Sequence, residues 1–171
     1  EATPDPLIGR ADIALYSAKD AGRKCYRVFE PGMEEHIKER RQLTADLHLA
    51  LEHDELEMYY QPIVAAASGE IRSMEALLRW KHPTRGFVSP AIFVPLAEES
   101  GLINAIGEWV LDRSCKDATT WPENVTVAVN FSALQVSRAE GIEAVRNALT
   151  ASRLDPKRLE LEVTETVLLA K

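Results

Sequence analysis

The sequence predicts an α/β fold, in which strands and helices alternate along the chain. The first observation is a set of segments typical of strands at residues 56–64, 125–131 and 159–165, of which the segment 56–64 is rich in aromatic and β-branched residues. The second is a set of segments with helical length and spacing, at residues 90–101, 103–120 and 141–152. The third is an ordinary composition, 46% hydrophobic over 171 residues, which suits one core of moderate size. This alternation is typical of βαβ units and a parallel sheet.

The charge and the lack of long apolar runs narrow the classes of partner. The chain has 20 Lys and Arg against 27 Asp and Glu, so it lacks the basic surface that a nucleic-acid polymer requires. A phosphate ligand held through a metal ion is compatible with this charge, because carboxylates ligate such ions. No apolar run reaches the ~18 residues of a membrane span, so no membrane contact is expected in this segment. Cys25 and Cys115 are expected to be free thiols, which favours a cytoplasmic location.

The N-terminal part predicts a helix, a short strand and a second helix. Residues 7–21 have helical spacing, and Gly22 is a plausible stop. Residues 25–29 predict a short strand that ends at Pro31-Gly32. The composition then becomes charged with helical spacing, which predicts a solvated connecting helix. We therefore predict three parts: residues 1–31, a connector over 32–52, and a second domain over 53–171. Both ends of the chain lie within patterned sequence, so we expect a piece of a longer protein.

Single residues predict the position of two elements in the second domain, the strand at residues 56–64 and the helix at residues 90–101. Pro62 within the strand at residues 56–64 predicts an edge position or a bulge, because proline cannot donate to a ladder. Ser89 and Pro90 predict the start of the helix that ends at Gly101, with serine as N-cap and proline in the first turn.

The segment between them, residues 71–80, leaves two structures open. As a helix it would place Glu75 and Arg79 on adjacent turns as a surface ion pair. As a strand it would place both on one face, because side chains alternate. Local propensity favours the helix, since Glu, Ala, Leu and Arg are good helix formers. Composition alone does not decide between them.

Polar residues lie where the later strands end. Asn130 and Ser132 share a face of their strand, and Glu160 and Glu162 share a face of theirs, with Glu165 following. In a parallel α/β architecture such groups converge on one site, and carboxylates with an amide oxygen suit Mg²⁺ or Mn²⁺. The alternatives are a turn-forming role for Asn130, an exposed edge strand for the two glutamates, and a structural ion pair for Glu75.

Several motifs, in order, resemble an EAL domain, the family of bacterial cyclic-di-GMP phosphodiesterases. They are Tyr60-Gln61-Pro62-Ile63, Glu75-Ala76-Leu77-Leu78-Arg79-Trp80, Asn130-Phe131-Ser132-Ala133-Leu134-Gln135 and Glu160-Leu161-Glu162-Val163-Thr164-Glu165. The resemblance covers about residues 40–171. Upstream, Ala11-Asp12-x-Ala14-Leu15-Tyr16-x-Ala18-Lys19-x-x-Gly22-Arg23 resembles the final helix of a GGDEF (diguanylate cyclase) domain.

The resemblance implies a fold, a reaction and a set of roles. The fold would be the first half of a modified TIM-type (β/α)₈ barrel, preceded by a short helix-strand remnant of a GGDEF domain. The reaction would be metal-dependent hydrolysis of cyclic-di-GMP to 5′-pGpG, with Mg²⁺ or Mn²⁺ as cofactor. Glu75, Asn130 and Glu162 would be metal ligands and Glu75 also catalytic, as would Glu165, an acid that holds an active-site loop. Gln61 and Arg79 would bind the substrate.

The family completes its site with residues from later strands, among them an Asp-Asp pair and a Lys. We therefore expect the 171-residue chain alone to be inactive, and the full-length protein to form a homodimer through this domain. The alternative function is a non-catalytic EAL domain that acts as a cyclic-di-GMP receptor or a protein-interaction module.

Overall fold

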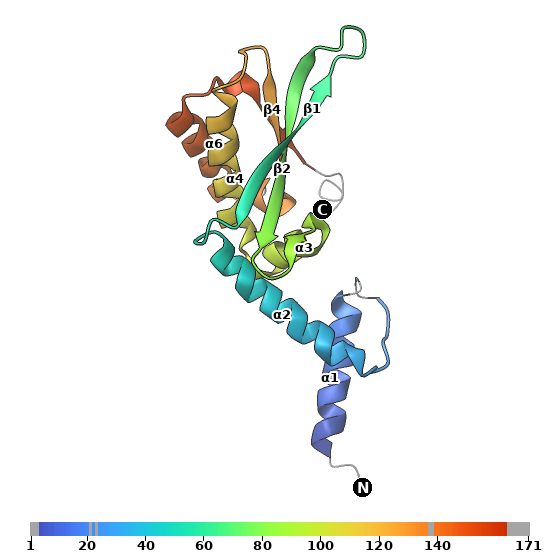
Figure 1. The fold of residues 1–171 in the computed structure, drawn as a ribbon. Coiled ribbons are helices and arrows are strands. Elements are labelled where there is room, and N and C mark those ends of the chain that lie inside the picture. Colours follow the sequence, from blue (N-terminus) through green and yellow to red (C-terminus); the bar gives the residue numbers. More distant parts are fainter. Residues whose placement is uncertain (1–3, 21, 23, 137–138, 164–171) are drawn as a thin grey trace. The chain divides into compact units, whose positions relative to one another are not determined.

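The chain forms two compact units, Glu1–Asp46 and Leu47–Lys171. A computed structural model describes residues 4–20, 22, 24–136 and 139–163. Figure 1 traces both units in the order of the sequence. Each unit is described by itself, and the domain boundaries expected at residues 31 and 52 remain a prediction.

The first unit contains helix α1 (Pro4–Asp20) and most of helix α2 (Gly32–Ala50). Both helices agree with the periodicity of the sequence. The strand predicted at residues 25–29 is wrong, because that segment has no ladder partner among the described residues. Tyr26 and Val28 are instead 87% and 71% exposed, and Phe29 lies beneath the guanidinium of Arg10 at 5.4 Å from the ring centre.

The second unit is built on a five-stranded sheet. Its strands are β1 (Leu56–Val64), β2 (Ile71–His82), β3 (Gly86–Val88), β4 (Thr126–Asn130) and β5 (Leu159–Glu162). The order is β1-β2-β4-β5, with β3 pairing with the end of β2. Strands β2, β4 and β5 run parallel, as predicted. Strand β1 is antiparallel to β2, so the prediction of a parallel sheet is wrong there. The connection of six residues between these strands is too short for a parallel crossover.

Strand β2 settles the alternatives for residues 71–80. It lies between β1 and β4 and pairs with both, so its backbone groups are used in two ladders. Ala76 and Trp80 are buried, and the Trp80 indole N–H donates to a Glu55 carboxylate oxygen at 3.1 Å. Tertiary pairing thus overrides the local helix propensity. Pro62 lies in β1, at the edge of the described sheet, and the register shifts just after it, between Ile63 and Val64.

The helices of the second unit follow the sequence signals closely. They are α3 (Pro90–Ser100), α4 (Ile103–Ala118), the short α5 (Ala133–Val136), α6 (Ala139–Ser152) and the 3₁₀ turn η1 (Pro156–Arg158). The Ser89 hydroxyl accepts a hydrogen bond from the Ala91 N–H, and Gly101 ends α3 in the left-handed conformation, at φ 80°. None of the described helices is long and apolar enough to cross a membrane.

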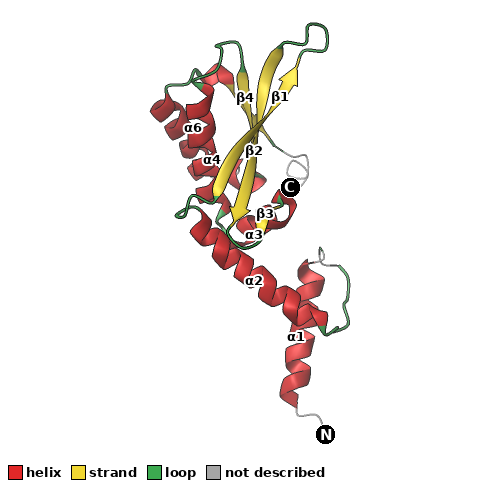
Figure 2. Ribbon diagram, in the orientation of Figure 1, coloured by secondary structure: helices red, strands yellow, loops and turns green. Residues whose placement is uncertain are grey.

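Helices α4 and α6 lie side by side against one face of the sheet, and α3 lies near the end of β2 (Figures 1 and 2). The core between the sheet and these helices is made of fully buried side chains: Trp80, Phe93, Leu111, Cys115, Val127 and Val129. The rings of Trp80 and Phe93 meet edge to face, with centres 5.8 Å apart.

Candidate active site

The sheet register places four of the predicted residues on one face. Gln61 stands opposite Glu75 in the β1–β2 pair, and Asn130 stands opposite Glu162 in the β4–β5 pair. Glu75 pairs with Ala128, two residues before Asn130 on β4. Because paired residues share a face and alternate residues share a face, all four project from the same side. We call this side the site face; the other side carries Val127 and Val129, which are buried under the helices.

Glu75 and Asn130 are in direct contact. The Asn130 side-chain N–H donates to one carboxylate oxygen of Glu75 at 3.0 Å. The second Glu75 oxygen and the Asn130 amide oxygen hydrogen-bond no side chain among the residues that the structure describes. Asn130 and Glu162 are exposed, and Glu75 is half-buried. This pair therefore presents two oxygen ligands to the site face, already oriented by a hydrogen bond.

Glu162 is held beside Asn130 by the backbone. The Phe131 N–H donates to the Glu162 carbonyl oxygen at 2.8 Å, which continues the β4–β5 pairing past Asn130. Ala128, which is fully buried, lies between Glu75 and Glu160 in the register.

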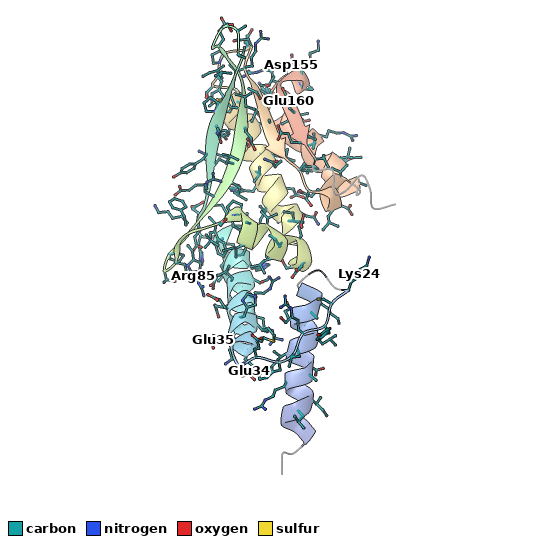
Figure 3. All side chains as sticks on the ribbon, turned by 90° about the vertical axis from the view of Figure 1, so that its right-hand side faces the viewer. Lys24, Glu34, Glu35, Arg85, Asp155 and Glu160 are labelled. Atoms are coloured by element: carbon teal, nitrogen blue, oxygen red, sulfur yellow. The ribbon has the colours of Figure 1, made fainter. Side chains whose placement is uncertain are left out.

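Glu160, the second acid of β5, has a different environment. Its carboxylate accepts a hydrogen bond from the Thr126 hydroxyl at 2.7 Å. Thr126 begins β4, so this contact draws the Glu160 carboxylate away from Asn130. In Figure 3, Glu160 lies near Asp155 at one end of the sheet, and Arg85 lies at the other. Of the two glutamates, Glu162 is therefore the one that the structure places beside Asn130.

Arg79 lies on the site face farther along β2. Its guanidinium donates to the Leu78 carbonyl oxygen at 3.0 Å and lies 5.8 Å from the centre of the Tyr59 ring. It lies four positions after Glu75 along the strand, a distance of about 13 Å, so the alternative of a helical ion pair between the two residues is wrong. Among the residues that the structure describes, the other guanidinium donors have no hydrogen-bond partner, so they could bind an anion.

A cavity of about 1060 Å³ opens where β4 and β5 end, beside residues 76–79 in the middle of β2. Arg79, Asn130 and Glu162 line it, together with Glu98 and Ser132. Its remaining walls are largely apolar residues of α3 and α4, including Pro90, Val94, Ile103, Ile106 and Val110. Gln61 and Glu75 share the face but lie outside the lining. In α/β barrels the carboxyl ends of the strands carry the functional groups, and this cavity has that position.

The sequence placed Ser132 near the strand end with Asn130, but it did not predict the contacts of Ser132 or a role for Gln135. The Ser132 hydroxyl donates to a carboxylate oxygen of Glu98 on α3 at 2.6 Å, and the buried Gln135 bonds to the backbone of Ser132. Both contacts join residues about 30 apart or lie in a short irregular turn, so no periodicity predicts them. Glu165, a predicted catalytic acid, lies outside the described residues.

The donor set of the site face suits a hard divalent cation. A carboxylate of Glu75, the amide oxygen of Asn130 and a carboxylate of Glu162 are all oxygen ligands of the kind that Mg²⁺ and Mn²⁺ take. Across residues 4–20, 22, 24–136 and 139–163, no three His, Cys, Asp or Glu side chains gather closely enough to form a metal cluster. The described residues thus supply two carboxylates and one amide oxygen, a donor set whose chemistry suits such an ion.

The fold and the site define a class: part of a TIM-like α/β barrel with an acid–amide cluster where its strands end. The chain belongs to the EAL domain family, whose model matches residues 44–171. Strand pairing, the position of Glu75 on a strand and the order of the motifs all agree with that assignment.

Curated relatives match nearly the whole chain. An uncharacterized signaling protein of Caulobacter vibrioides is 47% identical over 166 residues, 97% of this chain and 20% of its own length. The bifunctional diguanylate cyclase/cyclic di-GMP phosphodiesterase MucR of Pseudomonas aeruginosa is 46% identical over 168 residues, 96% of this chain and 24% of its own. The cyclic di-GMP phosphodiesterase NbdA of the same species is 39% identical, over 96% of this chain and 22% of its own. The chain thus spans about a quarter or less of these relatives.

Solved EAL structures share the fold. A structure of the MucR phosphodiesterase in complex with c-di-GMP matches with a TM-score of 0.73 and 46% identity, over 76% of this chain and 54% of that one. The EAL domain of FimX from Pseudomonas aeruginosa, bound to c-di-GMP, matches with a TM-score of 0.65 and 28% identity, over 73% and 51%. The chain spans about half of each, and the prediction of part of a TIM-type barrel is confirmed.

Proposed function

We propose that this chain supplies part of a cyclic-di-GMP phosphodiesterase, which hydrolyses one phosphodiester bond to give 5′-pGpG in bacterial signalling. The observation that carries the proposal is the hydrogen bond between Asn130 and Glu75 on the site face, with Glu162 beside it. The activities for which MucR and NbdA are named support it, since both proteins are similar to this chain over nearly all its length.

We further propose that Glu75, Asn130 and Glu162 hold Mg²⁺ or Mn²⁺. Such an ion, when bound, lowers the pKa of water and neutralises charge on a phosphate group. The chain's own residues then have separate tasks. Asn130 holds the Glu75 carboxylate in one orientation, which removes the entropy of fixing that ligand on binding. The metal dependence itself is tested by activity with and without a chelator.

Arg79 and Gln61 are proposed to bind the substrate. The Arg79 guanidinium carries donors in a planar fork that matches two oxygens of a phosphate group. Its contact with the Tyr59 ring restricts the side chain before binding. Gln61, exposed and opposite Glu75, offers an amide to the same face. The apolar walls of the cavity would cover the less polar parts of a nucleotide and exclude water. Glu165 is proposed to hold an active-site loop.

Residues beyond this chain are proposed to complete the site. The described side chains bring two carboxylates and one amide, and the chain spans 54% of the matched MucR structure. We therefore propose that an acidic pair and a lysine come from further strands, and that residues 1–171 alone do not turn over substrate. A compact monomer of these 171 residues that hydrolyses cyclic-di-GMP would contradict this.

Residues 1–31 are proposed to be the end of a GGDEF domain. MucR is a bifunctional diguanylate cyclase/phosphodiesterase, and its match covers 96% of this chain, which leaves out few of residues 1–31. Homodimerisation through the EAL domain likewise stays a prediction, which sedimentation of the intact protein would test.

The direct test is incubation of the intact protein with cyclic-di-GMP and Mg²⁺ or Mn²⁺, followed by chromatography. We expect 5′-pGpG to accumulate and its formation to stop when a chelator removes the ion. Tight binding of cyclic-di-GMP without any product would favour the receptor function instead. Hydrolysis that persists in excess chelator would contradict the metal site.

A further inference from the structure

Gln135 is a buried polar residue whose side-chain oxygen and nitrogen are both hydrogen-bonded. It is 4% exposed and lies in the short turn α5 that follows β4. Its side-chain oxygen accepts a hydrogen bond from the Ser132 N–H at 2.9 Å, and its side-chain nitrogen donates to the Ile103 carbonyl oxygen at 3.0 Å. The carboxamide thus joins the segment after β4 to the first turn of α4. Buried amides with both groups satisfied hold their neighbours in one arrangement.

Two glycines make room for this residue. A Cβ at Gly107 on α4 would overlap the Gln135 carboxamide nitrogen, and a Cβ at Gly141 on α6 would overlap the Gln135 backbone carbonyl oxygen. Glycine within a helix costs about 0.8–1.0 kcal/mol relative to alanine. Glycine thus lowers the stability of the helix at two positions, but it lets Gln135 pack against α4 and α6.

The contacts of Gln135 lead to the candidate site through Ser132. Ser132 receives the Gln135 contact on its backbone N–H, and its hydroxyl donates to Glu98 at 2.6 Å. Ser132 follows Asn130 by two residues, with Phe131 between them bonded to the Glu162 carbonyl oxygen at 2.8 Å. A continuous series of bonds therefore runs from α4 to the end of β4, where Asn130 contacts Glu75.

We propose that Gln135 is a positioning residue of the site: it fixes Ser132 and, through the end of β4, keeps Asn130 aligned with Glu75 and Glu162. This rests on the proposed function. It goes beyond a role in core stability, because its consequence is a change in metal affinity and not only in unfolding. Partners that orient a ligand in this way typically change metal affinity or activity by about 10–100-fold.

The experiment compares two substitutions in the intact protein. Gln135→Leu keeps much of the side-chain volume and removes both hydrogen bonds. Arg158→Leu is the matched control, because it removes three side-chain hydrogen bonds at the opposite end of β4. Mn²⁺ binding is measured by electron paramagnetic resonance, which needs no turnover. Amide hydrogen exchange at Phe131 and Ser132 and the kinetic constants are measured alongside.

We expect Gln135→Leu to weaken Mn²⁺ binding and lower kcat by about 10–100-fold, with KM for cyclic-di-GMP little changed. Exchange at Phe131 and Ser132 should be about tenfold faster, the loss of roughly one hydrogen bond. Arg158→Leu should lower the melting temperature and leave Mn²⁺ affinity as in the wild type. A folded Gln135→Leu protein with wild-type Mn²⁺ affinity overturns the proposal, even where exchange is faster.

Two further outcomes are also decisive. If the wild-type protein binds no Mn²⁺, the proposed metal site itself fails, and the positioning role of Gln135 in that site fails with it. If Gln135→Leu does not fold, Gly107→Ala replaces it, since the added methyl group displaces the carboxamide without deleting it. The same weakening of Mn²⁺ binding is expected from that variant, and wild-type affinity overturns the proposal.

Discussion

The two ends of strand β4 are held by different kinds of contact. Where β4 begins, Arg158 donates hydrogen bonds to three backbone carbonyl oxygens, of Val125 at 3.0 Å, Ala118 at 2.8 Å and Pro122 at 3.1 Å. Where β4 stops, Asn130 donates one bond to the side chain of Glu75. We call these the clamp end and the site end. At the clamp end, the charged Arg158 guanidinium hydrogen-bonds to backbone carbonyl oxygens. At the site end, side-chain oxygens of Glu75 and Asn130 remain available as ligands.

This difference shows how one strand can serve stability and function separately. The guanidinium of Arg158 satisfies carbonyls at the end of α4 and in the loop before β4, where a buried unpaired acceptor would be costly. The polar groups of the site end are exposed or half-buried, so water or a ligand can pair with the oxygens that the protein leaves unpaired. Barrel enzymes show the same division between the two ends of their strands. Substitutions at the two ends should therefore have opposite signatures.

The largest expected effect is at the site end. Glu75→Gln keeps an oxygen that can accept the Asn130 bond but removes the charge, so stability should be nearly unchanged. Loss of a metal ligand should lower kcat by about 10³-fold or more, since metal stabilisation is worth several kcal/mol. Glu160→Gln is the matched control on the same face and should retain activity. A Glu75→Gln protein that hydrolyses cyclic-di-GMP at the wild-type rate would show that Glu75 is no ligand.

Arg79→Ala should have the next largest effect on the kinetics, again without loss of stability. Truncating a buried phosphate contact costs on the order of 2–4 kcal/mol, so KM should rise about 30–1000-fold. The kinetics of cyclic-di-GMP hydrolysis measure this, and kcat should change less than KM. Arg79→Lys keeps the charge but loses the planar fork, and we expect an intermediate KM. Equal KM values for Arg79→Ala and wild type would remove Arg79 from the substrate site.

Arg158→Leu should show the reverse signature at the clamp end. Losing a charged donor to three carbonyl oxygens should lower the free energy of unfolding by on the order of 1–3 kcal/mol. Urea unfolding measures this, and kcat and KM of the folded protein should stay as in the wild type. A large loss of activity without loss of stability would mean that the two ends are not independent.

The smallest expected effect concerns the core between the two ends. Burial, with a contribution from the charge of Asp112, raises the pKa of the Cys115 thiol from 9.0 to about 11. The unfolded thiol loses its proton first, so the folded state is progressively destabilised as the pH rises from about 9 to about 11. Urea unfolding at pH 8 and pH 10.5 should show this loss. The Cys115→Ala variant should lose less unfolding free energy between pH 8 and pH 10.5 than the wild type. The same loss in both proteins would show that the Cys115 thiol is not its source.

Local signals in the sequence predicted most elements of the second unit. The cap at Ser89 and the stop at Gly101 fixed α3 to the residue, because capping is a local interaction. The polarity of Asn130 and Glu162 at strand ends predicted their convergence, and the register places them opposite each other. Glu75 required the resemblance to a family, because its segment has the propensity of a helix and becomes a strand only between two partners.

Other features depended on contacts that no local pattern contains. The antiparallel direction of β1 depended on a short connection, and the predicted strand at residues 25–29 failed for lack of a partner. The contact of Ser132 with Glu98 joins residues 34 positions apart. The packing of Gln135 depends on glycines in two different helices, Gly107 in α4 and Gly141 in α6. Such contacts are set by tertiary packing, which periodicity does not encode.

The central claim is that Glu75, Asn130 and Glu162 hold one divalent cation at the site end. A crystal structure of the intact protein grown with Mn²⁺, with anomalous scattering data, tests it most directly. We predict one anomalous peak about 2.1 Å from a Glu75 carboxylate oxygen, the Asn130 amide oxygen and a Glu162 carboxylate oxygen. Full-occupancy Mn²⁺ elsewhere, with these three side chains bonded only to protein or water, would contradict the account.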